Sequence, residues 1–119
     1  MKALVGMIAA LLFVMPVHAH ETKGAHGGAI VDAGNHHLEL VAKGQAIEVY
    51  VTDAADKPVS IEGFKGTAIL IAGGKPQRIV LTPATGNKMT GNASVSLPAA
   101  PKGAVQIQMP TGTSIQGKF

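Results

Sequence analysis

Turn residues recur regularly between short runs of alternating polarity, and this pattern constrains the fold of the chain most. Glycine occurs 15 times and proline 7 times among the 119 residues, and turn signals return about every ten residues. No window sustains the 3.6-residue apolar period of an amphipathic helix. The pattern predicts an all-β domain, a single small β-sandwich or barrel of about seven or eight mostly antiparallel strands. It does not choose between those two architectures.

The clearest strand pattern lies in residues 36–42 and 47–51, where apolar and polar residues alternate. Successive side chains of a strand point to opposite faces, so the leucines of the first run share one face while His37 and Glu39 share the other. Residues 43–45 read Lys-Gly-Gln, which suits a tight turn. The two runs are therefore predicted to form a β-hairpin.

Further strands are predicted from shorter apolar runs. The run at residues 67–72, TAILIA, is continuously apolar and bounded by glycines, which predicts a strand buried on both faces. The other runs predict strands at residues 59–61, 77–82, 93–97, 104–109 and 113–119.

The first residues read as a secretory signal peptide. Lys2 precedes an apolar run at residues 3–15, and a small-residue cleavage pattern ends at Ala19. The apolar run is shorter than the roughly 20 residues of a membrane span. We therefore expect three segments: a cleaved signal at 1–19, a flexible arm containing histidine and glycine at 20–28, and the β-domain at 29–119. The mature protein is expected to be soluble and exported to the periplasm, without a membrane span.

Composition narrows the possible partners. The chain has 10 Lys and Arg, 7 Asp and Glu, no Cys and no Trp. Loss of Lys2 with the signal would leave a net charge of about +2, too small and scattered to predict a nucleic acid or anionic membrane as partner. Without cysteine, thiolate chemistry is excluded, and with 3 Phe and 1 Tyr there is little surface on which sugars or bases could stack.

Four histidines remain after the predicted cleavage, and all lie in residues 20–37. His20 would become the first residue, so its free amine and its imidazole could chelate one ion, an arrangement that favours copper(II). His26 lies beside two glycines that let the backbone fold back. This crowding predicts a metal site, although a polar lead-in to the first long strand is the competing interpretation.

The adjacent pair His36 and His37 is predicted to point to opposite faces of a strand, so the two rings should not bind one ion together. His37 shares its face with Glu39, which could supply an oxygen ligand beside the imidazole nitrogen. His36 shares the face of the leucines and is expected to cap the edge of the core, while remaining an additional candidate ligand. No HExxH motif and no nucleophile elbow occur, and we expect no enzymatic activity.

Five short blocks occur in a fixed order, at residues 26–28, 37–41, 49–53, 57–59 and 81–84, followed by Gly86 and Asn87. Together they resemble small periplasmic proteins and the related segments of the periplasmic adaptor (membrane fusion) proteins of heavy-metal efflux pumps of the resistance-nodulation-division type. The resemblance implies an all-β periplasmic domain linked to metal efflux or resistance, with His26 and His37 as candidate ligands. His36 stands where the resemblance would place a tyrosine.

These patterns support two hypotheses about function. The first is a periplasmic metal-binding protein, a buffer or carrier that passes copper, or in second place zinc, to an efflux adaptor or pump component, with His20, His26, His37 and Glu39 as ligands. The second is a non-catalytic adaptor that binds a protein through an exposed edge strand such as residues 113–119, with incidental histidines. The oligomeric state stays open.

Overall fold

The structure, a computed structural model, describes residues 23–119. This part of the chain is all-β and contains no helix. Its eight strands are β1 (Ala29–Ala33), β2 (His36–Lys43), β3 (Ala46–Asp53), β4 (Lys65–Ala72), β5 (Lys75–Pro83), β6 (Lys88–Asn92), β7 (Gly103–Gln108) and β8 (Ser114–Lys118).

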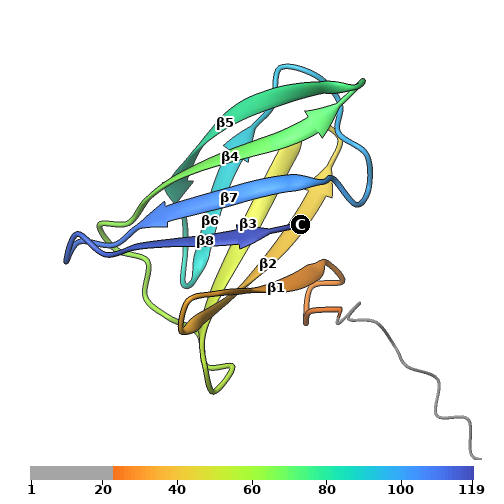
Figure 1. The fold of residues 1–119 in the computed structure, drawn as a ribbon. Helices are drawn as coiled ribbons and strands as arrows, with labels where there is room; N and C mark the ends of the chain where they lie inside the picture. The colour runs from red at the N-terminus through yellow and green to blue at the C-terminus, as the bar shows by residue number, and fades with distance from the viewer. Residues whose placement is uncertain (1–22) are drawn as a thin grey trace, which may run out of the picture.

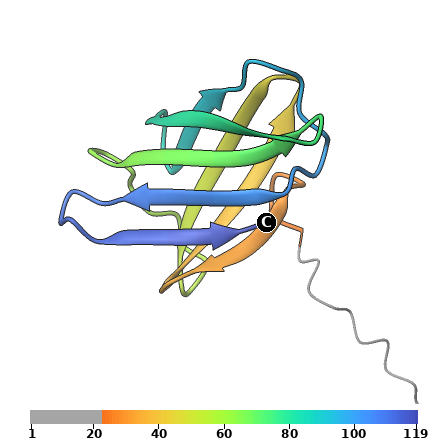
Figure 2. The same ribbon diagram turned by 45° about the horizontal axis from the view of Figure 1, so that its top comes forward.

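The eight strands form one antiparallel sheet in the order β1-β2-β3-β6-β5-β4-β7-β8. The sheet curls so that β5, β4, β7 and β8 lie over β6, β3 and β2 (Figures 1 and 2). Its two end strands, β1 and β8, contact each other and nearly close the sheet into a barrel. The predicted all-β fold of about seven or eight antiparallel strands is confirmed, and its form is barrel-like.

The core is aliphatic and follows the alternation of the strands. Ile47, Val49 and Val51 of β3 are at most 1% exposed, while the residues between them face outward. The hairpin of β2 and β3 is confirmed, with Lys43 opposite Ala46 in the register.

Residues without side chains allow the strands to approach where the sheet curls. At Gly91 of β6, a Cβ would lie 2.6 Å from the carbonyl oxygen of Val80 and 2.7 Å from Ile79 Cγ2. At Gly117 of β8, a Cβ would lie 2.6 Å from Val31 Cγ2 on β1. Contacts under 3 Å would push the strands apart, so glycine at these positions permits near-closure.

Three strand predictions need correction. Residues 59–61 and 93–97 are irregular, because the chain there crosses between strands and makes no ladder. The run at residues 67–72 lies in β4 but is buried on one face only, with Ile69 48% and Ile71 41% exposed. A continuous apolar run did not mean two-sided burial here because no second layer covers the outer face of β4.

Candidate functional site

The outward side chains of β1, β2 and β3 surround an open depression of about 920 Å³. These side chains share the face opposite the core because they alternate with the buried residues of each strand. Seven of the thirteen residues that line the depression carry ionisable side chains. Its lining residues are Ala25, His26, Ile30, Val31, Asp32, His37, Glu39, Tyr50, Thr52, Asp56, Pro58, Asn87 and Lys118.

Glu39 lies on this outward face, yet it is only 6% exposed. Its Oε2 accepts hydrogen bonds of 2.9 Å from the backbone N–H groups of His26 and Gly28, and its Oε1 lies 2.9 Å from His26 Nδ1. The carboxylate therefore anchors residues 23–28, which fold over it as a turn closed by the bond from Gly24 N–H to the Gly28 carbonyl. A flexible arm was expected at residues 20–28, but the described part of it is a docked turn.

The ring of His26 stacks on the ring of Tyr50, with centroids 3.5 Å apart and an interplanar angle of 6°. Because Nδ1 faces the Glu39 carboxylate, donation of its proton there leaves Nε2 as the nitrogen with a lone pair. The His26 side chain is 44% exposed. The turn and the stack thus hold one histidine in a fixed orientation at the mouth of the depression.

Below this stack, Tyr50 donates a hydrogen bond of 3.0 Å to Glu48 Oε2. Burial raises the pKa of the Tyr50 hydroxyl above its ordinary value, and the hydrogen bond to Glu48 and the charges of Glu48 and Glu39 raise it further. Burial would also raise the pKa of Glu48, but hydrogen bonds from Lys88 and Tyr50 outweigh it and hold that pKa below its ordinary value. Glu48 therefore stays ionised and keeps the Tyr50 hydroxyl in place.

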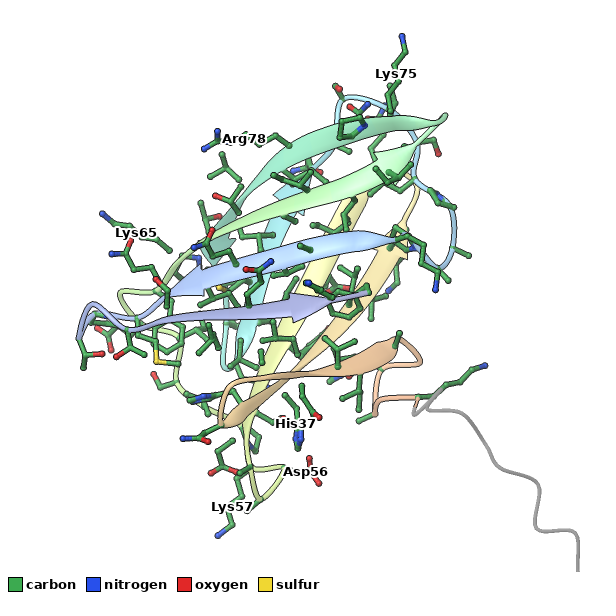
Figure 3. All side chains as sticks on the ribbon, in the orientation of Figure 1. His37, Asp56, Lys57, Lys65, Lys75 and Arg78 are labelled. Atoms are coloured by element: carbon green, nitrogen blue, oxygen red, sulfur yellow. The ribbon has the colours of Figure 1, made fainter. Side chains whose placement is uncertain are left out.

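His37 lies between two carboxylates. Its Nδ1 is 2.9 Å from Asp56 Oδ1, and its Nε2 is 3.0 Å from Asp32 Oδ1. Asp32 is its neighbour across the β1–β2 ladder, whereas Asp56 comes from the loop after β3; Figure 3 shows His37 and Asp56 side by side at one end of the barrel. With both ring nitrogens facing carboxylate oxygens, this position suits either a proton or a metal ion beside Nε2.

Asp53 shapes the loop that brings Asp56 to His37. Its Oδ1 accepts hydrogen bonds from the backbone N–H groups of Ala55 at 2.8 Å and Lys57 at 3.0 Å, which is an Asx-type turn. Asp56 itself has a φ of 61°, a conformation that aspartate tolerates better than most residues. This local geometry places the Asp56 carboxylate against the imidazole.

The Asp53 turn predicts a pH effect on stability. The hydrogen bond from Lys57 N–H lowers the pKa of Asp53 below its ordinary value; slight burial opposes this, and the bond from Ala55 adds to it. The stabilisation is therefore fully present above the unfolded-state pKa of about 3.9 and is lost as the pH falls through the lower folded-state pKa. Wild type should lose more stability than Asp53→Asn below about pH 4, measured by urea unfolding at several pH values. Parallel pH profiles would contradict this role.

Among the described residues, no hydrogen bond or ion pair joins His36 or Glu39 to His37. His36 points toward the core edge, with its Nδ1 buried and without a hydrogen-bond partner among the described residues, so it does not join the depression. His20 and the predicted signal at 1–19 lie outside the described residues. Glu39 was predicted as a ligand beside His37, but its oxygens are taken by His26 and Gly28. Among residues 23–119, no three His, Asp or Glu side chains surround one point as a complete metal site.

Sequence reasoning missed Asp32 and Asp56 as partners of His37. Asp32 lies in β1, where no strand was predicted. Its position opposite His37 in the β1–β2 ladder could therefore not be predicted. Asp56 lies 19 residues from His37 in the sequence, in the loop after β3, and no local pattern brings the two together. The short apolar run at residues 29–31, followed closely by Gly34-Asn35, was the signal that could have revealed β1 and hence the pair of Asp32 and His37.

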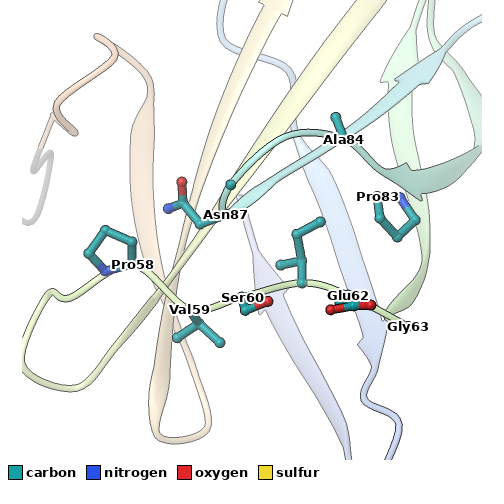
Figure 4. Close-up of a pocket in the computed structure, with 10 residues that line it drawn as sticks. Pro58, Val59, Ser60, Glu62, Gly63, Pro83, Ala84 and Asn87 are labelled. Atoms are coloured by element: carbon teal, nitrogen blue, oxygen red, sulfur yellow. The ribbon is translucent and has the colours of Figure 1, made fainter.

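A second depression, of about 530 Å³, lies between residues 58–63 and the end of β5 (Figure 4). Its ten lining residues include one ionisable group, Glu62. The other lining groups are mainly apolar side chains and backbone, so the depression on the outer face of β1–β3 is the better candidate.

Comparison with known protein families, with curated proteins and with solved structures finds no match for this chain. Among the described residues, no helix is long and apolar enough to cross a membrane. The function must therefore be argued from the geometry of the candidate site.

Proposed function

We propose that the protein binds a divalent transition-metal ion between His37 Nε2 and the carboxylate of Asp32. The separation of 3.0 Å between these two atoms supports the proposal. Two ligands at about 2.1 Å from one ion lie about 3.0 Å apart when the angle between them is about 90°, and about 3.4 Å apart at the tetrahedral angle. The observed separation therefore suits neighbouring ligands of copper(II) better than those of zinc.

The surroundings of His37 add support. The histidine ligands of metals commonly donate their second ring N–H to a carboxylate, which orients the ring and makes the other nitrogen a stronger ligand. Asp56 stands in that position, 2.9 Å from Nδ1. In this proposal Asp56 orients the ligand, Asp32 binds the ion, and the metal replaces the proton at Nε2.

Further ligands are proposed from the segment before β1. His26 lines the same depression as His37. It is bound to Glu39, the next outward residue of β2 after His37, about 7 Å along the strand. The Nε2 of His26 would reach the ion once the docked turn moves by several ångströms toward His37. His20, which lies outside the described residues, is proposed to add its amine and imidazole if the chain is cleaved after Ala19.

The proposed role is that of a periplasmic buffer or carrier that passes copper to an efflux adaptor or pump component. An open depression with few protein ligands suits transfer, because the ion remains accessible to a partner's ligands. The alternative role, an adaptor that adds a partner strand at residues 113–119, has less support because Gly117 of β8 already packs against Val31 of β1.

Isothermal titration of the exported protein with copper(II), together with electron paramagnetic resonance of the complex, tests the proposal. Wild type should bind one ion at the site, and both His37→Ala and Asp32→Asn should abolish this binding step and change the nitrogen coupling or the g values. Asp56→Asn should weaken binding about 10-fold to 100-fold while keeping the same ligand set.

His36→Ala is the matched control, since its ring points to the core edge and copper binding should not change. A His20→Ala variant separates this site from an amine chelate at the N-terminus. If His37→Ala and Asp32→Asn leave stoichiometry and affinity unchanged, copper binds elsewhere on the protein and the proposal fails.

A further inference from the structure

Charge is divided between the two halves of the chain. Every acidic residue lies at or before Glu62, whereas residues 63–119 contain no Asp or Glu. The basic side chains of this second half are Lys65, Lys75, Arg78, Lys88, Lys102 and Lys118. Because residues 63–119 form β4 to β8, one side of the barrel carries positive charge that no carboxylate side chain of its own strands offsets.

The outer faces of β4 and β5 combine this charge with exposed aliphatic side chains. Val80 is 64% exposed and Ile69 48%, and Arg78 lies directly opposite Ile69 in the ladder. Arg78 and Val80, together with Lys65 at the start of β4, line an open depression of about 540 Å³. We call these four residues, Lys65, Ile69, Arg78 and Val80, the basic face. Clustered exposed aliphatics on a sheet face are typical of a surface that another molecule covers.

A complementary surface lies on the same chain. Asp32 and Asp56, whose side chains are 88% and 78% exposed, flank the depression on the outer face of β1–β3, which also contains the apolar side chains of Ile30 and Pro58. We call Asp32 and Asp56 the acidic end. Figure 3 shows Asp56 at the bottom of the molecule and Arg78 in the upper part, on the outer side of β5, so one molecule cannot join the two surfaces within itself.

We propose that the basic face of one molecule docks on the acidic end of a second copy. Arg78 and Lys65 would face Asp32 and Asp56 of the next copy, while Ile69 and Val80 would cover its Ile30 and Pro58. The two surfaces differ, so the contact is head-to-tail and leaves one free surface of each kind on a dimer. Association should therefore continue beyond the dimer as concentration rises.

The shape of the basic face favours a protein over a lipid bilayer as its occupant. Its aliphatic side chains lie on the middle of a sheet and do not project from a loop tip. It contains no Trp or Tyr, the residues that anchor proteins at a bilayer surface. A folded partner with carboxylates around a depression could pair with the basic side chains and cover the aliphatic ones. The acidic end is such a surface.

Sedimentation velocity of the exported protein in EDTA tests the proposal independently of any metal. The weight-average sedimentation coefficient of wild type should rise with protein concentration at about 20 mM salt and return to the monomer value at about 500 mM salt. Arg78→Glu and Asp32→Lys should each lower the association constant about 10-fold. Lys43→Glu, an equal charge change at an exposed residue outside both surfaces, should have little effect.

Mixing the two charge-reversed variants gives the decisive measurement. The reversed basic face of Arg78→Glu matches the reversed acidic end of Asp32→Lys, so an equimolar mixture should associate more strongly than either variant alone. Wild type that stays monomeric at low salt, equal losses in Arg78→Glu and Lys43→Glu, or no recovery on mixing would overturn the proposal. Binding of monomeric wild type to phosphatidylglycerol vesicles would also overturn it, by assigning the face to a membrane.

Discussion

Replacing Glu39 with alanine is expected to destabilise the folded protein by about 3 kcal/mol and to release residues 23–28 from the outer face of β2 and β3. The carboxylate contacts three donors in this segment, at 2.9 Å each. A hydrogen bond to a charged group contributes about 1.5 to 3 kcal/mol. The expected loss of about 3 kcal/mol is smaller than the sum of three such hydrogen bonds, because the released N–H groups can bind water.

Urea unfolding gives the change in the free energy of unfolding, and amide hydrogen exchange at His26 and Gly28 reports release of the turn. Glu62→Ala removes an exposed carboxylate from a loop and should change stability by less than about 0.5 kcal/mol. Retained protection of both amides in Glu39→Ala would mean that the stack of His26 on Tyr50 holds the turn by itself.

Gly103→Ala is expected to cost at least about 3 kcal/mol, or to prevent folding, because the β4–β7 ladder leaves no room for a side chain. Gly103 has a φ of 147°, and its Cβ would overlap the carbonyl oxygen of Ile69. Gly103 also exchanges backbone hydrogen bonds of 3.2 and 2.8 Å with Phe119. A shift of Gly103 would therefore disturb β4, β7 and the C-terminal residue together.

Gly112→Ala is the matched control for this variant. Gly112 has a φ of 90°, but a Cβ there would meet nothing within 4 Å. Its replacement tests backbone strain alone, with an expected cost of about 1 kcal/mol. Thermal unfolding of both variants separates strain from steric overlap: equal losses of stability would show that the close approach of Ile69 is relieved by a small backbone shift.

The hairpin of β2 and β3 is the part of the fold that the sequence predicted best. Alternation placed His37 and Glu39 on one face and the leucines on the other, and the structure has that arrangement. Residues 67–72 show where it failed, since an apolar run does not reveal whether a second layer covers its outer face. For Ile69 and Ile71 none does, and the exposed Ile69 belongs to the proposed docking surface.

Within the candidate site, sequence reasoning proposed His26, His37 and Glu39 as ligands, and it did not foresee that Glu39 is hydrogen-bonded to His26 and Gly28. A buried carboxylate on an outward face requires something to cover it. Residues 23–28 can do so because Gly24 and Gly28 have no side chain that would overlap Glu39 and the Leu40 carbonyl. Asp32 and Asp56 reach His37 from the neighbouring strand and from a loop. Neither contact follows from the spacing of residues along the chain.

The sequence by itself determined the all-β class, the central hairpin and the face on which each of its side chains lies, because a strand repeats every two residues and that period is local. Only the tertiary structure decided that the sheet curls into a barrel, that Glu39 anchors residues 23–28, and that two carboxylates flank His37. These features depend on which strands pair and how closely they approach, and contacts between distant segments of the chain determine both.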